Sequence, residues 1–193
     1  IAEADWLDLS TGIAPNPWPL PSLPVSAWAR LPEEDDELAA RAAHSYGAQH
    51  ALPVAGSQAA IQALPMLWPR SRVGVLEPCY AEHRAAWQRA GHVVQPVAGG
   101  QIEAQLAQLE VLVLVNPNNP TGQRFAREQL LDWHARLARR GGLLLVDEAF
   151  MDCTPQHSLA ACTDRPGLVV LRSFGKFFGL AGVRLGFVLA EPS

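Results

Sequence analysis

VLVLVN at residues 111–116 and LLLVDE at residues 143–148 are two short apolar runs, and each is followed by polar or turn-forming residues. Each run has the length of a buried strand and is much too short to cross a bilayer. Between them, residues 127–140 have the apolar spacing of a helix. A buried strand, a helix and a second buried strand in succession are typical of a parallel sheet covered by helices.

The same alternation continues on both sides of this unit. Further helix-like stretches are residues 35–45, 57–68 and 81–90. Further strand-like runs are VGVLE at 73–77, GLVVLRS at 167–173 and RLGFVLA at 184–190. We therefore expect an α/β fold, a three-layer α/β/α sandwich with a mostly parallel sheet.

The composition divides the chain into two regions. Residues 1–34 are rich in proline and tryptophan, with PNPWPLPSLP at 15–24, and we expect an N-terminal extended arm there. Residues 35–193 have the length and the apolar content of one domain with its own core.

Charge and cysteine content limit the classes of partner. The net charge is −4, and no basic patch is interleaved with aromatic residues, so we expect no nucleic-acid partner. No apolar run reaches the length of a membrane helix, so we expect no membrane partner. Cys79, Cys153 and Cys162 lack the spacing of a metal site, which favours free thiols in a reducing cytoplasm and no bound metal.

Polar residues follow three of the expected strands, where ligands of open parallel sheets bind. NPNNPTG occupies residues 116–122, Asp147 ends the run at 143–148, and SFGK occupies residues 173–176. Lys176 is the only lysine of the chain, whose other basic residues are all arginine. A lysine can lose its proton and attack a carbonyl, which arginine cannot readily do. Lys176 is therefore a candidate nucleophile.

A second group of residues predicts an anion site. Gly56 and Ser57 form a turn that leads directly into the helix expected at 57–68, and helix N-termini bind anions through their free N–H groups. Ser173 and Arg184 can add a hydroxyl and a guanidinium. The alternatives are an ordinary Ser57 N-cap and an ion pair at Arg184.

Two further residues indicate a heterocyclic ligand. Asp147 ends an apolar strand, where a carboxylate is costly without a cationic partner such as a protonated ring nitrogen. Tyr80 follows the run at 73–77 and can stack on a flat ring. Asp147 as a helix cap and Tyr80 as core packing are the alternatives. A nucleophilic amine, an anion site, a carboxylate and an aromatic ring are together what a pyridoxal phosphate site requires.

In this order and spacing, GSQ, P-x-Y, NPNNPTG, VDEAF and SFGKFFGLAGVRLG resemble the large domain of the class I/II aminotransferases, the pyridoxal phosphate enzymes of the aspartate aminotransferase fold. The resemblance implies that Lys176 forms the internal aldimine, that Asp147 pairs with the pyridine nitrogen, that Asn119 bonds the ring oxygen and that Tyr80 stacks on the ring. The phosphate ligands that it implies are Ser57, Gln58, Ser173 and Arg184, and we expect Gly56 to bind the cofactor as well.

Within this family, residues 7–21 and 52–62 are most similar to the threonine-phosphate decarboxylases of cobalamin biosynthesis, relatives of the histidinol-phosphate aminotransferases. The resemblance implies decarboxylation of L-threonine-O-3-phosphate, a homodimer, and substrate contacts by Gly12 and Asn119. The alternatives are transamination of a phosphorylated amino acid such as histidinol phosphate, and a non-catalytic chain that keeps the fold. A dinucleotide-binding domain is excluded because no strand is followed by G-x-G-x-x-G.

The chain departs from the family pattern at several positions. Phe150 and Leu31 stand where relatives often have tyrosine, and Gly12 and Ala14 stand where relatives often have asparagine. The resemblance also implies a small C-terminal domain that carries the arginine for the substrate carboxylate. We expect this domain to be absent, so that the chain is a fragment of the large domain that binds the cofactor weakly and lacks turnover.

Overall fold

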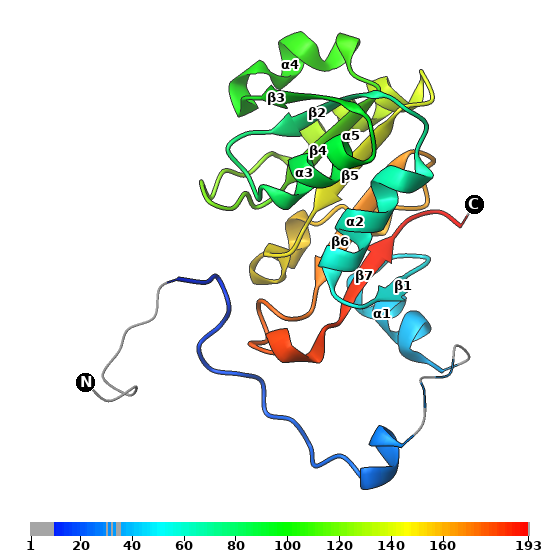
Figure 1. Ribbon diagram of the computed structural model, residues 1–193, viewed down its shortest axis with the longest axis vertical. Coiled ribbons are helices and arrows are strands. Elements are labelled where there is room, and N and C mark those ends of the chain that lie inside the picture. Colours follow the sequence, from blue (N-terminus) through cyan, green and yellow to red (C-terminus); the bar gives the residue numbers. More distant parts are fainter. Residues whose placement is uncertain (1–9, 30, 32, 34–35, 193) are drawn as a thin grey trace.

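The computed structural model describes residues 10–29, 31, 33 and 36–192. Its centre is a seven-stranded sheet in the order β1-β7-β6-β5-β4-β2-β3 (Figure 1). The strands are β1 (Leu52–Val54), β2 (Arg72–Leu76), β3 (Val93–Val97), β4 (Val111–Val115), β5 (Leu143–Asp147), β6 (Leu168–Ser173) and β7 (Gly186–Leu189).

The pairing of these strands confirms the expected mostly parallel sheet. β6, β5, β4, β2 and β3 pair in parallel along the sheet, whereas β7 is antiparallel to both β6 and β1. In the β4–β5 ladder Val115 is paired with Asp147, and in the β5–β6 ladder Asp147 is paired with Leu171. The carboxyl ends of these three central strands therefore lie at one edge of the sheet.

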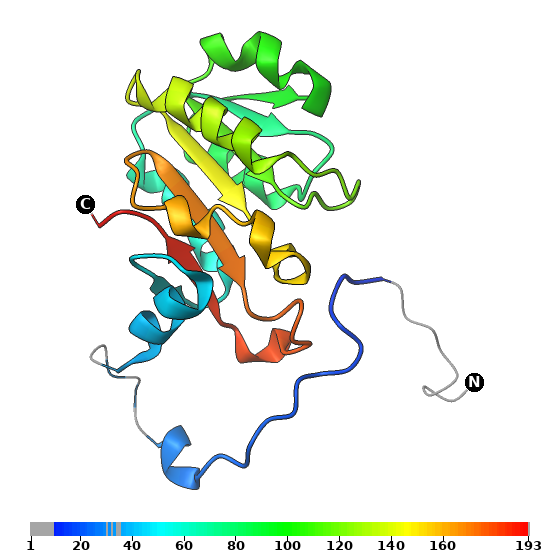
Figure 2. The same ribbon diagram turned by 180° about the vertical axis from the view of Figure 1, so that it is seen from behind.

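Helices cover both faces of the sheet. The α-helices are α1 (Leu38–Tyr46), α2 (Ser57–Leu67), α3 (Glu82–Arg89), α4 (Ile102–Gln105) and α5 (Arg127–Ala138). Short 3-10 turns are found at Val25–Trp28, Gly99–Gln101, Leu106–Gln108, Met151–Cys153, Pro155–His157, Ala160–Cys162 and Ala181–Val183. α2 and α3 lie in front of the sheet in Figure 1, and α1 and α5 lie on the opposite face, which Figure 2 shows.

The alternation of side chains along the strands produces two apolar cores. Val111 and Val113 of β4 pack in the core under α2 and α3, together with Ile61 and Trp87. Leu112 and Leu114 of the same strand belong to the other core, which α5 covers with residues such as Trp133. Because successive residues of a strand point to opposite faces, an all-apolar strand can supply both cores. The fold is thus the expected three-layer α/β/α sandwich.

The expected elements agree with the observed ones to within a few residues, with a few differences. The helix expected from residue 35 begins at Leu38, whose N–H donates to Asp36 Oδ1 at 2.8 Å; Asp35 lies outside the described residues. The strand expected from residue 184 begins at Gly186, since Arg184 is left-handed with φ 53°. β1, β3 and α4 were not anticipated.

The N-terminal segment runs away from the sheet in an extended course, apart from the 3-10 turn at Val25–Trp28 (Figure 2). Two backbone bonds join it to the loop after β6: the N–H of Ala14 donates to the carbonyl of Lys176 at 2.9 Å, and that of Trp18 donates to the carbonyl of Phe178 at 2.8 Å. The part of the expected arm at residues 1–9 lies outside the described residues. Among the helices that the structure describes, none has both the length and the apolar character of a membrane span.

Candidate functional site

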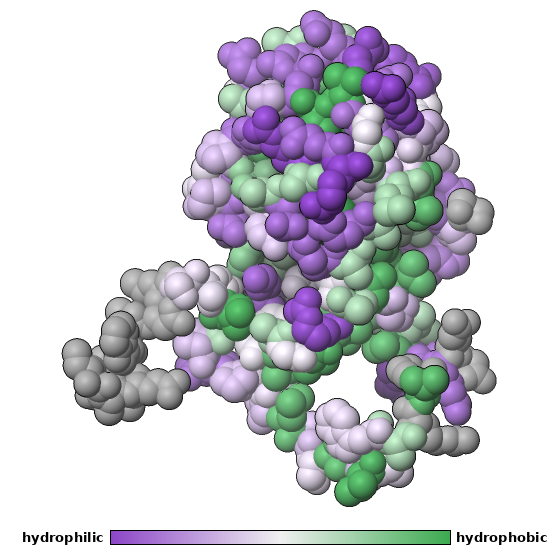
Figure 3. All heavy atoms as spheres, viewed as in Figure 1, coloured by the Kyte–Doolittle hydropathy of each residue, from purple (hydrophilic) through white to green (hydrophobic). Residues whose placement is uncertain are grey.

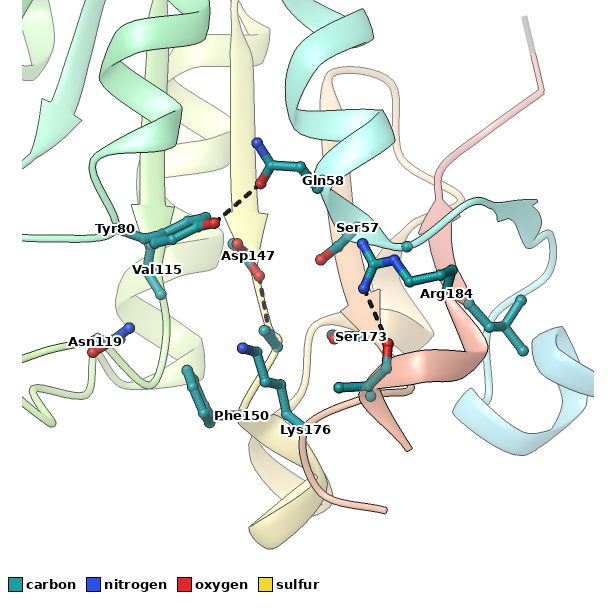
Figure 4. A pocket seen from close by; sticks show the side chains of 15 residues that line it. Ser57, Gln58, Tyr80, Val115, Asn119, Asp147, Phe150, Ser173, Lys176 and Arg184 are labelled. Carbon is teal, nitrogen blue, oxygen red and sulfur yellow. Dashed lines mark hydrogen bonds between the residues drawn. The ribbon is translucent and has the colours of Figure 1, made fainter. Parts of the chain in front are cut away.

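A cavity of about 150 Å³ lies at the carboxyl edge of β4, β5 and β6, on the face that α2 and α3 cover (Figure 4). All nine residues predicted to bind a cofactor line it: Gly56, Ser57, Gln58, Tyr80, Asn119, Asp147, Ser173, Lys176 and Arg184. These residues come from five segments that are far apart in the sequence. The topology therefore brings the predicted set together at one place.

The N-terminus of α2 forms one end of the cavity. Gly56 is the N-cap residue, with φ 76° and ψ 154°, and no side chain caps the helix. Ser57 is the first residue within the helix, so the alternative interpretation of Ser57 as the N-cap is wrong. A backbone conformation of this kind is essentially restricted to glycine. Without a side-chain cap, the first N–H groups of α2 remain available to an anion.

Arg184 lies directly over this helix end. A Cβ added to Gly56 would lie 2.8 Å from Arg184 Nη2, so the glycine allows the guanidinium to approach the backbone. Arg184 is the one non-glycine residue with positive φ in the described part of the chain. Such a conformation costs roughly 1 kcal/mol or more and is often found at ligand sites. Its Nη1 donates to the Ala181 carbonyl at 3.1 Å, and no carboxylate among the described residues is within ion-pair distance.

Asp147 forms the opposite end of the cavity. Its side chain is buried, with the residue only 3% exposed. Oδ1 accepts the N–H of Ala149 at 3.0 Å, and Oδ2 lies 2.9 Å from His83 Nε2. A carboxylate has about four acceptor positions, so Asp147 retains capacity for one further donor from the cavity. The alternative interpretation of Asp147 as a helix cap accounts for the bond from Ala149 but not for the contact with His83.

His83 is a site residue that the sequence analysis missed. It lies on α3, is fully buried, and has no partner for Nδ1 among the described residues. With the ring proton on Nε2, His83 donates to Asp147 and fixes the orientation of the carboxylate. The segment AEHRAAWQR has the pattern of an ordinary helix. Only the contact with Asp147, 64 residues away, identifies His83.

Tyr80 forms a side wall between the two ends. The residue is 40% exposed and its hydroxyl donates to Gln58 Oε1 at 3.2 Å. Burial, with the carboxylates of Glu82 and Asp147, raises the pKa of Tyr80 against the opposing effect of Arg184, so the phenol stays protonated at neutral pH. The Nε2 of Gln58 donates to Glu82 at 2.8 Å. Gln58 is therefore available to an anion through its backbone N–H rather than its side chain.

Lys176 lies between the ends, and its amine points into the cavity (Figure 4). Ser173, at the end of β6, is buried beside it and offers a hydroxyl. Asn119 is exposed at the opposite rim. The neighbouring Asn118 has a structural role instead, because its Nδ2 donates to the Pro78 carbonyl at 2.8 Å and to Thr121 Oγ1 at 2.7 Å.

Gly12 lies outside this cavity, in an adjoining pocket on the side of the arm. Phe150 and Lys176 line both pockets and so separate them. A Cβ on Gly12 would lie 2.7 Å from Phe150 Cε1, so Gly12 allows the arm to contact the Phe150 ring closely. A contact between Gly12 and a substrate stays a prediction.

The polar groups of the cavity are divided by charge. Hydrogen-bond donors gather around the N-terminus of α2, a buried carboxylate lies at the far end, and one primary amine lies between them. This fold and this site define a member of a large group of α/β enzymes. The chain belongs to the aminotransferase class I and II family, whose model matches residues 25–193.

Threonine-phosphate decarboxylases are among the proteins that this chain resembles in sequence and in fold. The chain is 67% identical over 191 residues to the threonine-phosphate decarboxylase of Pseudomonas aeruginosa, covering 99% of this chain and 58% of that protein. The structure is similar to that of L-threonine-O-3-phosphate decarboxylase from Porphyromonas gingivalis, with a TM-score of 0.66 and 23% identity over 73% of this chain and 46% of the other.

A third similar structure is the histidinol-phosphate aminotransferase from Sinorhizobium meliloti in complex with pyridoxal-5'-phosphate. The TM-score is 0.62, with 24% identity over 74% of this chain and 42% of that one. The chain thus spans less than two thirds of the length of each of these proteins.

Proposed function

We propose that the chain binds pyridoxal 5'-phosphate in this cavity and belongs to an enzyme that decarboxylates L-threonine-O-3-phosphate. The observation that carries the cofactor assignment is the division of the cavity into a cluster of donors and a buried carboxylate, with the one lysine of the sequence between them. A small ring with a phosphate on one side and a basic nitrogen on the other has the complementary charges.

The residues present fit this group on two independent grounds. At the phosphate end, the N-terminus of α2 has no side-chain cap, and glycine at position 56 leaves space that a Cβ would fill. Ser57, Ser173 and Arg184 surround this end with further donors. At the ring end, Asp147 is buried and oriented by His83, with acceptor capacity left for a ring N–H.

Each residue then has a specific task. Lys176 would hold the cofactor through its ε-amine and could also move a proton at the substrate. Asp147 would pair with a protonated ring nitrogen, Tyr80 would cover one ring face, and Asn119 would bond the ring oxygen. When bound, pyridoxal phosphate supplies an electrophilic aldehyde and an electron-accepting ring. Phe150 lines the cavity without a hydroxyl, so it offers no hydrogen bond to the ring oxygen.

The choice of substrate rests on the relatives. The high identity to the Pseudomonas protein supports O-phosphothreonine. Histidinol-phosphate aminotransferases that are 36–45% identical over part of the chain support the second candidate, transamination of a phosphorylated amino acid such as histidinol phosphate. Both reactions begin at the same site and differ in which bond at the α-carbon breaks.

The remaining parts of the proposal concern assembly. We place the protein in the cytoplasm as a homodimer, with residues 1–34 as an arm and residues 35–193 as the cofactor-binding domain. The free thiols of Cys79, Cys153 and Cys162 support a reducing compartment. Exposed apolar side chains on the arm, along the lower part of Figure 3, support a protein partner. They are Trp18, Leu20, Leu23, Val25, Trp28 and Leu31.

The cofactor assignment is tested by absorbance. Adding pyridoxal phosphate to the chain should produce a yellow species, and Lys176→Ala should abolish it. Because the chain has no second lysine, the N-terminal amine is the only other aliphatic amine that can react. Arg184→Gln should keep the yellow species but weaken binding about 10- to 100-fold, through the loss of a charged hydrogen bond. A yellow species that forms as tightly with Lys176→Ala as with the wild-type chain would refute the assignment of Lys176.

The reaction is tested with the natural protein that contains this chain. Incubation with O-phosphothreonine should release CO2 without a keto acid. A product that requires 2-oxoglutarate, with no CO2, would favour the aminotransferase and refute the decarboxylase.

A further inference from the structure

A network of four side chains connects α3 to the wall of the cavity. Glu82, in the first turn of α3, accepts hydrogen bonds at Oε2 from Gln58 Nε2 at 2.8 Å and from Gln62 Nε2 at 3.0 Å. Gln58 and Gln62 are one turn apart on α2 and therefore lie on the same side of the helix. The side-chain oxygen Oε1 of Gln58 accepts a hydrogen bond from the hydroxyl of Tyr80 at 3.2 Å.

The direction of every bond in this network is determined by its members. A carboxylate only accepts, so each glutamine must present its NH2 group to Glu82 and its carbonyl away from it. A guanidinium only donates, and Arg89 donates to the carbonyl of Gln62, which agrees with this orientation. The carbonyl of Gln58 then faces Tyr80, whose hydroxyl must be the donor.

We propose that Glu82 is a positioning residue that holds the Tyr80 ring in place as the cavity wall by orienting the Gln58 amide. Without an acceptor at position 82, the Gln58 amide loses the bond that anchors it and is free to move away from the phenol. Tyr80, which is 40% exposed, then loses the bond that fixes the far end of its ring. The role of the Tyr80 ring as a stacking surface rests on the proposed function, whereas the effect of Glu82 on the orientation of this ring does not.

Glu82 and His83 are adjacent in the sequence, so the start of one helix supports two parts of the site. α3 begins at Glu82, and its first two residues orient two different parts of the site. Glu82 acts on Tyr80 through Gln58, and His83 acts on Asp147 directly. One turn of one helix therefore determines both the side wall and the ring end of the cavity.

The test needs no ligand, because the chain contains only two tyrosines. Protein labelled with 13C at the tyrosine ring should give two sets of NMR signals, which Tyr46→Phe assigns. In Glu82→Ala the relaxation of the Tyr80 ring should show a clear loss of order. Tyr46 packs against Phe187 far from Glu82, and its unchanged signal verifies that the variant is folded.

Two further variants test whether Glu82 acts by orienting the Gln58 amide or through its negative charge. Glu82→Gln removes the charge but keeps an acceptor oxygen, so the order of the Tyr80 ring should remain close to that of the wild type. Gln58→Met should lower the order as much as Glu82→Ala does, and adding Glu82→Ala to Gln58→Met should have no further effect. Equal losses in Glu82→Gln and Glu82→Ala, or an undiminished effect in the Gln58→Met background, would overturn the proposal.

A second measurement connects the ring to ligand binding. Glu82→Ala should weaken the binding of pyridoxal phosphate about two- to tenfold, the value of one ordinary hydrogen bond. Glu128→Ala is the matched control, since Glu128 is an exposed carboxylate in the first turn of α5, away from α2. A disordered ring with unchanged affinity would retain the role of Glu82 but refute the stacking role of Tyr80.

Discussion

Where β5 and β6 end, residues that are adjacent in the sequence have opposite surroundings. Asp147 and Ser173 face the cavity, whereas Glu148 and Arg172 face the other side of the sheet and are buried. There, Arg172 Nη1 donates to Glu148 Oε2 at 3.0 Å, and Nη2 donates to Asp152 at 2.5 Å. Ser158 and the backbone of Leu159 donate to the same glutamate, and Tyr46 lies against the guanidinium.

The difference shows that a buried ion pair stabilises one side of this sheet edge, whereas the other side keeps donors for a ligand. On the buried side Glu148 has its charge matched by Arg172, and burial raises the pKa of Glu148 against the opposing effect of Arg172. On the cavity side Arg184 and the first N–H groups of α2 have no acidic partner among the described residues. The buried ion pair links the end of β5 to β6, and the donors on the cavity side remain available for an anion.

Breaking the buried pair should have the largest effect on stability. Arg172→Met leaves the Glu148 carboxylate buried without its cation, and the free energy of unfolding should fall by about 3–5 kcal/mol. Guanidinium denaturation followed by circular dichroism measures this. Arg139→Met, at an exposed arginine that follows α5, should change it by at most about 0.5 kcal/mol. Equal effects of the two variants would show that the buried pair does not hold the edge.

A smaller effect is expected on the cavity side. Gly56→Ala forces a side chain into the φ 76°, ψ 154° conformation and against Arg184, which should cost about 1–3 kcal/mol. The same change should weaken phosphate binding, because the guanidinium is displaced. Gly182→Ala is the control, since a Cβ there meets no atom within 4 Å. If the two alanine variants unfold at the same denaturant concentration, the strained helix start is not required for the fold.

The effect that is smallest at neutral pH concerns the ionisation of the Cys79 thiol beside the cavity. Burial, with the charges of Glu77 and Asp147, raises the pKa of Cys79 to about 12. The unfolded thiol titrates near 8.5, so the unfolded state releases its proton first and stability falls as pH rises from about 8.5 toward 12. Cys79→Ser should reduce this alkaline slope, while Cys153→Ser, at an exposed thiol, should leave it in place. An identical loss of stability at alkaline pH in the wild type and in Cys79→Ser would contradict the raised pKa of Cys79.

The sequence predicted the central part of the sheet better than its edges. The strands found by their apolar runs lie inside the sheet, where both faces are buried. The two missed strands, β1 and β3, are the edge strands and contain Pro53 and Pro96. Proline argues against a strand in a sequence, yet an edge strand tolerates it because one side of its backbone needs no partner.

The site shows a similar division. Residues at strand ends and in short motifs were predicted as a set, because the edge of a parallel sheet collects the loops that follow its strands. Their supporting residues were not predicted: Glu82 and His83 act through contacts with partners that are 24 and 64 residues away. Local pattern also suggested Ser57 as the N-cap, whereas the glycine before it holds that position.

The place of β7 has a consequence for folding. β7 lies between β6 and β1, so β1 has no neighbour in the sheet until residues 186–189 have paired with it. The loop that carries Lys176 is joined to β7 and also binds the segment at residues 14–18. Lys176 therefore reaches its final position only after contacts between segments far apart in the sequence have formed.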